Sequence, residues 1–242
     1  MSIESQFLPE GADAGSPIAA LFPRTVVVRE RRASGEAADL LPGEAAFVKG
    51  ARPKRIDEFA AGRWCARSAL AELGQRDVAL LPAADRQPIW PSGFVGSITH
   101  TTGLCAAAVA AADNVLAIGL DSEIVGAPTT DIWPTLCCDD ELVWVEQVLR
   151  EIDRPAAVTL LFCAKEAFYK CQYPLAGEWL DFHDLLVHVP HWGAAAGAFV
   201  VHARRDLRIS QYAQLPIEGR YVFHEEFVSA GVLIPAPSTA AQ

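Results

Sequence analysis

The sequence contains no apolar run long enough to cross a membrane. Its longest run, residues 104–112, falls far short of the roughly 20 residues that a membrane helix requires. The first 15 residues also lack the basic stretch and the apolar stretch of a secretory signal peptide. These absences predict a cytoplasmic protein.

Positive charge is scarce as well. The formal net charge is -10 at pH 7, with 20 Lys and Arg against 30 Asp and Glu. An acidic surface repels phosphate backbones and anionic lipid, which excludes nucleic acid and membranes as the main partners. A small anionic ligand requires a local cluster of cations.

No cysteine belongs to a CxxC pair. We expect reduced and mostly buried thiols, as is usual in the cytoplasm. The six cysteines stand at positions 65, 105, 137, 138, 163 and 171.

Hydrophobic residues make up 51% of the 242 residues, which is enough to form a substantial core. Strand patterns occupy residues 25–30, 94–101, 103–111, 115–124, 185–189, 198–204 and 220–234, and helical patterns occupy 43–73, 139–152 and 155–174. The helix at 43–73 should break near Pro53, the strands at 94–124 should form an antiparallel meander, and Gly219 should supply a hairpin turn. The order of elements predicts an α+β (α/β) fold with two similar lobes, 1–115 and 116–242, in a single compact unit.

The strand VLAIGLDSEI carries two carboxylates, Asp121 and Glu123, on one face because side chains alternate along a strand. Ser122 should point away from them, so its identity should matter little. Oxygen ligands of this kind suit Mg²⁺. The other interpretation, that both acids are solvated at the end of the strand, stays open here.

The apolar helix LLFCAKEAFYKCQYP contains Lys165, Glu166 and Lys170. An ordinary pair between Glu166 and Lys170, four residues apart, is one interpretation. The other is a site, in which Glu166 adds a third carboxylate for a metal or accepts a proton, and the lysines bind phosphate.

Five segments together resemble one family, the 4'-phosphopantetheinyl transferases, and its monomeric enterobactin- and surfactin-type group most closely. GLDSE is followed about 40 residues later by FCAKEAFYK, similar to the family's GxDxE and KExxxK motifs. GSITHT, KRIDEFAAGRWCARSAL and RQPIWP resemble three further family segments. The similar segments span residues 52–175, about half of the chain.

The resemblance implies a monomeric enzyme of pseudo-dimeric fold that moves phosphopantetheine from coenzyme A to a serine of a carrier protein and releases 3',5'-ADP. It implies coenzyme A in a cleft between the lobes. Mg²⁺, with Mn²⁺ as an alternative, would be held by Asp121, Glu123 and Glu166. Glu166, or a metal-bound water, would be the base.

The resemblance also implies a set of phosphate-binding residues, and it assigns Lys165 to the catalytic group as a phosphate contact near the metal. Arg86 would replace a lysine that some relatives carry. The full set for coenzyme A is Arg55, Arg63, Arg86, His100, Lys165 and Lys170.

The carrier is expected to dock on residues 127–149, through apolar side chains such as Ile132, Trp133 and Leu136. Fatty-acid, polyketide and siderophore or other nonribosomal peptide carriers all remain open. So do two other classes of function: a non-catalytic coenzyme A- or carrier-binding module of the same fold, and a different magnesium-dependent phosphoester hydrolase.

Overall fold

The computed structural model describes residues 16–32 and 35–237, which divide into two units. One unit holds the described residues up to Ile118 and those from Leu233 onward, and the other runs from Gly119 to Val232. These two units differ in two respects from the expected lobes, 1–115 and 116–242. The boundary follows Ile118, and the described residues from Leu233 onward belong to the first unit.

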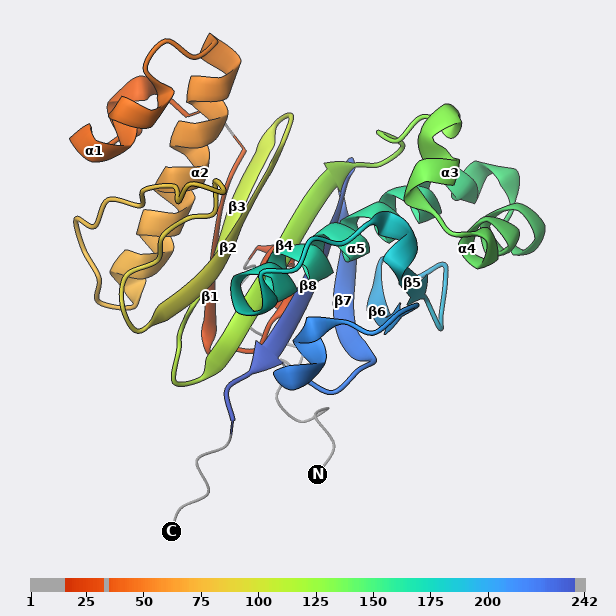
Figure 1. Cartoon of the computed structure of the whole chain (residues 1–242). Helices are drawn as coiled ribbons and strands as arrows, with labels where there is room; N and C mark the ends of the chain where they lie inside the picture. Colours follow the sequence, from red (N-terminus) through yellow and green to blue (C-terminus); the bar gives the residue numbers. More distant parts are fainter. Residues whose placement is uncertain (1–15, 33–34, 238–242) are drawn as a thin grey trace. The chain divides into compact units, whose positions relative to one another are not determined.

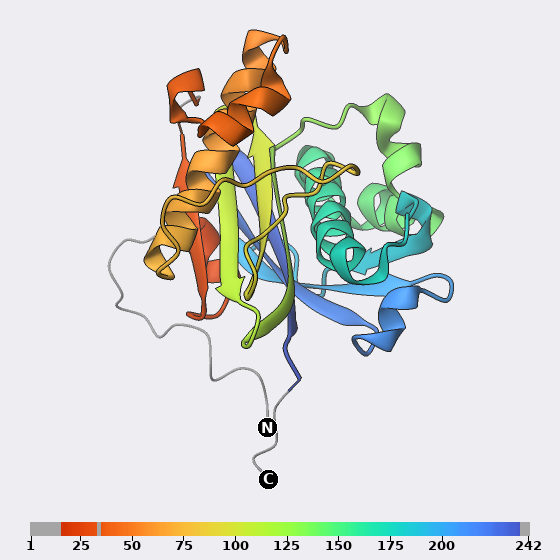
Figure 2. The ribbon, with the colours of Figure 1, turned by 60° about the vertical axis from the view of Figure 1, so that its left-hand side comes forward.

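The first unit is built on a three-stranded antiparallel sheet in the order β1-β3-β2. Helix α2 runs along one face of this sheet (Figures 1 and 2). The expected meander is wrong in its third strand, because β3 pairs with β1 and β2 and the segment after it joins another sheet. The elements are β1 (Val26–Arg31), α1 (Pro42–Ala45), α2 (Pro53–Glu72), β2 (Phe94–Thr101) and β3 (Leu104–Ala111).

Small side chains explain how closely α2 packs on this sheet. The buried cluster consists mainly of alanine, cysteine, valine and leucine. Pro53 occupies the first turn of α2, where its missing N–H breaks no helical hydrogen bond, and it separates α2 from α1 as the sequence predicted. Gly74 follows the helix with φ +87°, a conformation that suits glycine at a helix end.

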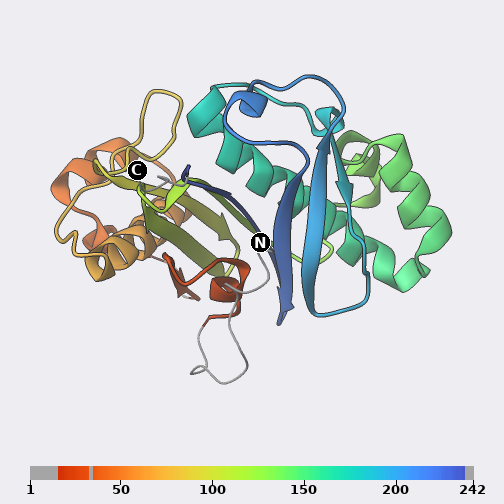
Figure 3. The ribbon, with the colours of Figure 1, turned by 90° about the horizontal axis from the view of Figure 1, so that it is seen from below.

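The second sheet has five strands in the order β4-β8-β7-β6-β5. Helix α5 lies along one face of it (Figures 1 and 3). The elements are β4 (Val115–Ile124), α3 (Trp133–Leu136), α4 (Asp139–Val143), a π-helical turn (Trp144–Val148), α5 (Arg154–Ala176), β5 (Leu185–His188), β6 (Ala196–Ala203), β7 (Ile217–His224) and β8 (Phe227–Pro235).

Three details differ from the sequence-based expectations. Gly219 lies inside β7, at a position where any side chain would collide with the ring of Phe199. The hairpin turn falls instead at residues 225–226. The helix predicted at 139–152 is α4 followed by the π-helical turn. Helix α5 continues past Pro174 and ends at Gly177, which has φ +58°.

All six cysteines are free and buried, as predicted from their apolar surroundings. Burial raises the pKa of Cys65 to about 12 and that of Cys105 to about 11. Within the described residues, no helix combines the length and the apolar character needed to cross a membrane.

One glycine sets the distance between α5 and the sheet. A Cβ atom on Gly119 would lie 1.8 Å from the carbonyl oxygen of Ala167 and 2.8 Å from the backbone nitrogen of Cys171. The backbone of α5 therefore rests directly on β4. Glu166 precedes Ala167, and Asp121 follows Gly119 by two residues on the same face of the strand, so this contact determines how near their carboxylates lie.

We predict that Gly119→Ala lowers the free energy of unfolding by about 3 kcal/mol, because backbone atoms cannot move aside for the added methyl group. Urea denaturation measures this change. Gly43→Ala is the matched control, since its methyl group would meet only side chains, at 3.4 Å or more. Equal stability of the two variants would contradict the proposed contact.

Candidate active site

Asp121 and Glu123 lie on the face of β4 that α5 covers. Side chains alternate between the two faces of a strand, so residues 119, 121 and 123 share one face, and Gly119 contacts α5. Asp121 is buried, with 5% of its surface exposed, and Glu123 is partly exposed. The strand therefore presents two negative charges to the helix.

Lys170 of α5 meets the first of these charges. Its Nζ donates hydrogen bonds to Oδ1 of Asp121 at 2.7 Å and to the carbonyl oxygen of Leu120 at 3.3 Å. Burial alone would lower the pKa of Lys170, but the carboxylates of Asp121 and Glu166 outweigh it, and the pKa lies above its ordinary value. Lys170 is therefore a cation at this site.

The environment of Glu166 favours the neutral form of its side chain, whereas that of Lys170 favours the charged form. Burial raises the pKa of its carboxyl group, the charges of Asp121 and Glu123 raise it further, and Lys170 opposes them. The three carboxylates are thus close enough to interact electrostatically. A carboxyl group with a raised pKa is a better proton acceptor at neutral pH than an unperturbed one.

The chemistry of these donors fits a divalent cation such as Mg²⁺, which prefers carboxylate oxygens. Across residues 16–32 and 35–237, however, no three His, Cys, Asp or Glu side chains already form an arrangement that could hold a metal ion. Lys170 occupies one oxygen of Asp121 instead. The site matches the ion in charge and ligand type, and the side chains would have to close around it.

The raised pKa of Glu166 predicts how stability depends on pH without metal. A carboxyl group with a higher pKa in the folded state favours folding below its unfolded value, 4.5, and this contribution is lost as the pH rises through the folded value. Glu166→Gln, which stays neutral, should therefore be more stable than the wild type at pH 7 in a metal chelator.

Urea denaturation at pH 7 and near pH 4 tests this expectation. The advantage of Glu166→Gln should shrink at the lower pH, where wild-type Glu166 is protonated in both states. Glu218→Gln, at an exposed position of β7, should show no such dependence. An advantage of equal size at both pH values would show that the carboxylates do not act on Glu166.

Lys165 does not join this cluster through its hydrogen bonds. Its side chain is 1% exposed, and Nζ donates to Oε2 of Glu141 at 2.6 Å and to the carbonyl oxygens of Leu136 and Phe182, both at 2.9 Å. The sequence suggested a phosphate contact for Lys165, but the structure turns its ammonium group toward acceptors in the protein. Glu141 received no role from the sequence, since an acid at a helix start is usually solvated.

A cavity of about 190 Å³ opens beside Glu166. Aromatic and apolar side chains form much of its wall, and Trp179 is 69% exposed. The lining residues are Lys165, Glu166, Tyr169, Trp179, Leu180, Asp181, Phe182 and Leu185.

Ser122 lies between the two carboxylates in sequence and takes part in a buried polar chain. Its Oγ lies 2.7 Å from Oγ of Ser229 on β8, and that atom lies 2.9 Å from Nε2 of His224 on β7. The sequence assigned little importance to Ser122 and no role to His224. Buried polar groups require such partners, so this chain fixes the three side chains relative to one another.

In the first unit, the structure brings Arg55 and His100 together. Both side chains are exposed, and Nη1 of Arg55 lies 3.5 Å from Nε2 of His100. Glu58 lies 3.9 Å from the same ring nitrogen. An exposed guanidinium beside an imidazole is a suitable receptor for a phosphate group.

Arg63 does not share this position. It is 6% exposed, its Nε donates to the carbonyl oxygen of Leu80 at 2.7 Å, and its guanidinium group lies over the ring of Phe59. Burial, together with the charges of Arg55 and Arg67 and against that of Glu44, lowers the pKa of Arg63 to about 10. Eight helical residues turn Arg63 about 80° from Arg55, which places it toward the core.

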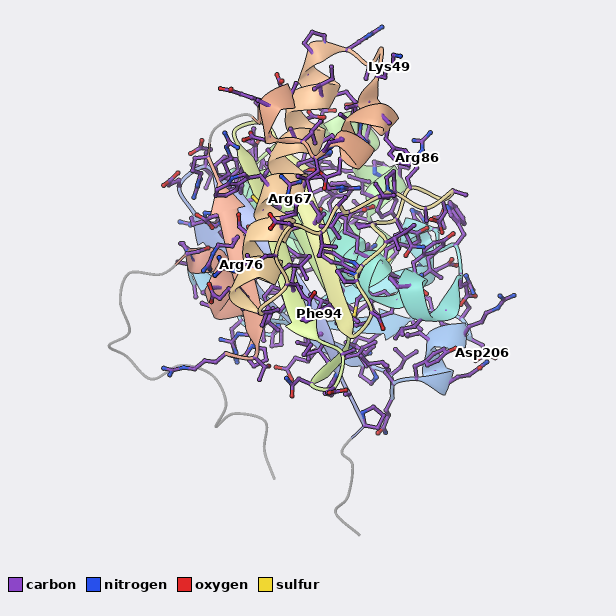
Figure 4. All side chains as sticks on the ribbon, turned by 90° about the vertical axis from the view of Figure 1, so that its left-hand side faces the viewer. Lys49, Arg67, Arg76, Arg86, Phe94 and Asp206 are labelled. Atoms are coloured by element: carbon purple, nitrogen blue, oxygen red, sulfur yellow. The ribbon has the colours of Figure 1, made fainter. Side chains whose placement is uncertain are left out.

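Arg86 lies on the loop between α2 and β2. Its side chain is exposed, and its backbone has φ +74°, an uncommon value outside glycine (Figure 4).

The expected docking segment, residues 127–149, is less exposed than the sequence suggested. Trp133 and Leu136 are buried, at 9% and 6% exposure, because α3 packs against α5. Ile132 and Val143 remain exposed, at 40% and 49%.

Comparison with known families gives two matches along the chain. Residues 43–110 match the 4'-phosphopantetheinyl transferase N-terminal domain, and residues 117–222 match the 4'-phosphopantetheinyl transferase superfamily. The second match contains Asp121, Glu123, Glu141, Lys165, Glu166 and Lys170.

Curated proteins give the same result, in one case over almost the whole length of the chain. The chain is 35% identical over 231 residues to the 4'-phosphopantetheinyl transferase Svp of Streptomyces mobaraensis, covering 93% of this chain and 92% of Svp. It is 35% identical over 177 residues to the 4'-phosphopantetheinyl transferase PptT of Mycobacterium tuberculosis, covering 70% and 76%. Enterobactin synthase component D of Salmonella typhimurium is 37% identical over 125 residues, covering 51% and 50%.

Proposed function

Because the chain belongs to the 4'-phosphopantetheinyl transferase superfamily, we propose that it transfers the 4'-phosphopantetheine group of coenzyme A to a serine of an apo carrier protein. Adenosine 3',5'-bisphosphate is the second product. The observation that carries the proposal is the partly buried Glu166 near Asp121 and Glu123, with its pKa raised by desolvation and by their charges.

In the proposed reaction, Glu166 accepts the proton of the carrier serine as the serine oxygen attacks the phosphorus atom next to pantetheine. The bond from that phosphorus to the bridging oxygen breaks, and the oxygen leaves with the adenosine bisphosphate. The raised pKa of Glu166 makes it a better proton acceptor than an ordinary glutamate carboxylate.

Asp121 and Glu123 are proposed to hold Mg²⁺, or Mn²⁺, together with Glu166. When bound, such an ion neutralises the pyrophosphate and the charge that develops on the leaving oxygen. Lys170 supplies a fixed positive charge next to Asp121 and limits the repulsion among the carboxylates. It is also proposed to contact a phosphate of coenzyme A.

The residues proposed to bind coenzyme A in the first unit are Arg55 and His100, whose side chains are exposed and adjacent. Arg63 and Arg86 are also proposed to bind coenzyme A, but Arg63 would first have to leave its buried position, whereas Arg86 is already exposed. The non-catalytic alternative has no support among the relatives that match. The carrier class, the monomeric state and the cytoplasmic location remain predictions.

We predict that incubation with coenzyme A and Mg²⁺ adds the mass of one phosphopantetheine to an apo carrier protein, measured on the intact carrier. Fatty-acid, polyketide and nonribosomal peptide carriers should be compared. Removing the proton acceptor by Glu166→Gln should slow transfer by roughly 10²- to 10⁴-fold. A metal chelator should stop transfer, and added Mg²⁺ should restore it.

Glu218→Gln is the matched control and should behave as the wild type, because its side chain is exposed on β7. No mass gain on any carrier would contradict the transfer itself. Full activity of Glu166→Gln would instead leave the transfer standing and remove Glu166 as the base.

Arg55→Ala should raise the KM for coenzyme A about tenfold and leave kcat nearly unchanged, since it removes one charge-assisted hydrogen bond to the substrate. Arg76→Ala is the matched control, because Arg76 is equally exposed but lies beyond the opposite end of α2 (Figure 4). Steady-state kinetics measure both variants. Similar KM values for the two would remove Arg55 from the binding site.

A further inference from the structure

A buried ion pair joins Glu141 of α4 to Lys165 of α5, and the reaction described above gives it no task. Both side chains are 1% exposed, and Nζ lies 2.6 Å from Oε2. Burying two charges is costly unless the geometry is good and the remaining polar atoms also find partners. The partners of each atom therefore show what the pair does.

The ammonium group of Lys165 is fully used. It has three N–H donors. They reach Oε2 of Glu141, the carbonyl oxygen of Leu136 at the end of α3 and the carbonyl oxygen of Phe182. A phosphate group could bind Lys165 only by displacing one of these buried acceptors.

The carboxylate of Glu141 makes further contacts. Its Oε2 also accepts a hydrogen bond from the backbone N–H of Cys138 at 2.8 Å, and its Oε1 accepts one from the backbone N–H of Val187 at 2.7 Å. Val187 belongs to β5. The pair thus ties α5 to α3, α4, β5 and the turn at residues 182–184 through one buried point.

This point lies next to Glu166 in sequence. Successive residues on a helix point about 100° apart, so fixing the direction of Lys165 also fixes the direction of Glu166. Gly119 sets how closely α5 approaches β4, but a contact between backbones does not prevent the helix from turning about its axis. The ion pair restrains this rotation from the side of α5 that faces α3 and α4, in addition to the hydrogen bonds of Lys170 to β4.

We propose that Glu141 and Lys165 are positioning residues, which hold Glu166 toward Asp121 and Glu123 and do not contact the substrate. The same pair holds Phe182 in the wall of the cavity beside Glu166. This inference rests on the role of Glu166 given under the proposed function. It replaces the phosphate contact suggested for Lys165 by the sequence.

Glu141→Gln separates the two roles of Lys165, because it leaves the lysine in place and keeps the size of its partner. A positioning role predicts that kcat falls roughly 10- to 100-fold, as expected when a reacting group is misplaced. The affinity for coenzyme A in a metal chelator, measured by calorimetry, should stay the same, and the affinity for Mn²⁺, measured by electron paramagnetic resonance, should fall. Glu218→Gln is the control, and thermal denaturation confirms that each variant is folded.

The wild-type protein offers a second measurement that needs no stable variant. The chain has only four lysines, so its ¹⁵N-lysine spectrum contains four ammonium signals at most. The signal of the enclosed Lys165 should exchange its protons slowly and should not shift when coenzyme A is added without metal. Lys170→Arg identifies the signal of the other lysine of α5.

The outcomes are distinct. A large shift of the Lys165 signal with coenzyme A, or a loss of coenzyme A affinity in Glu141→Gln, would mean that Lys165 contacts phosphate directly. Unchanged kcat and Mn²⁺ affinity in Glu141→Gln, beside an inactive Glu166→Gln, would overturn the positioning role alone. Full activity of Glu166→Gln would instead overturn the proposed function of Glu166.

Discussion

The candidate active site depends on the contact between two backbones, that of α5 at Ala167 and that of β4 at Gly119. Without a side chain at Gly119, the helix lies directly on the strand, and carboxylates from two elements far apart in sequence become neighbours. Most helices are separated from a sheet by a layer of side chains. Here that layer is absent at one point, and Asp121 and Glu166 each lie within two positions of it in sequence.

Crowding of like charge is the cost of this arrangement, and the structure contains two responses to it. Lys170 places an ammonium group on Asp121, and Glu166 holds its proton more tightly than an ordinary glutamate. Both responses leave the carboxylates ready for a cation of higher charge. Under the proposed function, an acidic protein would bind a polyphosphate through positive charge gathered at this site, from Lys170 and a divalent cation, rather than through charge spread over its surface.

The sequence predicted the elements of the site better than their connections. Alternation along β4 was sufficient to place Asp121 and Glu123 on one face, and the helical pattern at 155–174 was sufficient to predict α5. Helical spacing could not show that Lys165 turns inward, because its partner Glu141 is 24 residues away and looks like a solvated acid at a helix start. Similarly, Arg63 resembles a surface arginine in sequence, and only the packed loop at Leu80 explains its burial. Strand pairing was misjudged for the same reason: whether β4 continues the first sheet depends on partners at the end of the chain.

The burial of the six thiols affects how readily this protein reacts with alkylating agents and oxidants. At neutral pH a thiol with a pKa of about 11 or 12 is almost never ionised, and the thiolate is the form that alkylating agents and peroxides attack. Burial of all six side chains, together with the raised pKa values of Cys65, Cys105 and Cys137, is therefore expected to protect the folded protein from such reagents. Every thiol becomes reactive once the chain opens, so the rate of alkylation directly reports how often the native structure is lost.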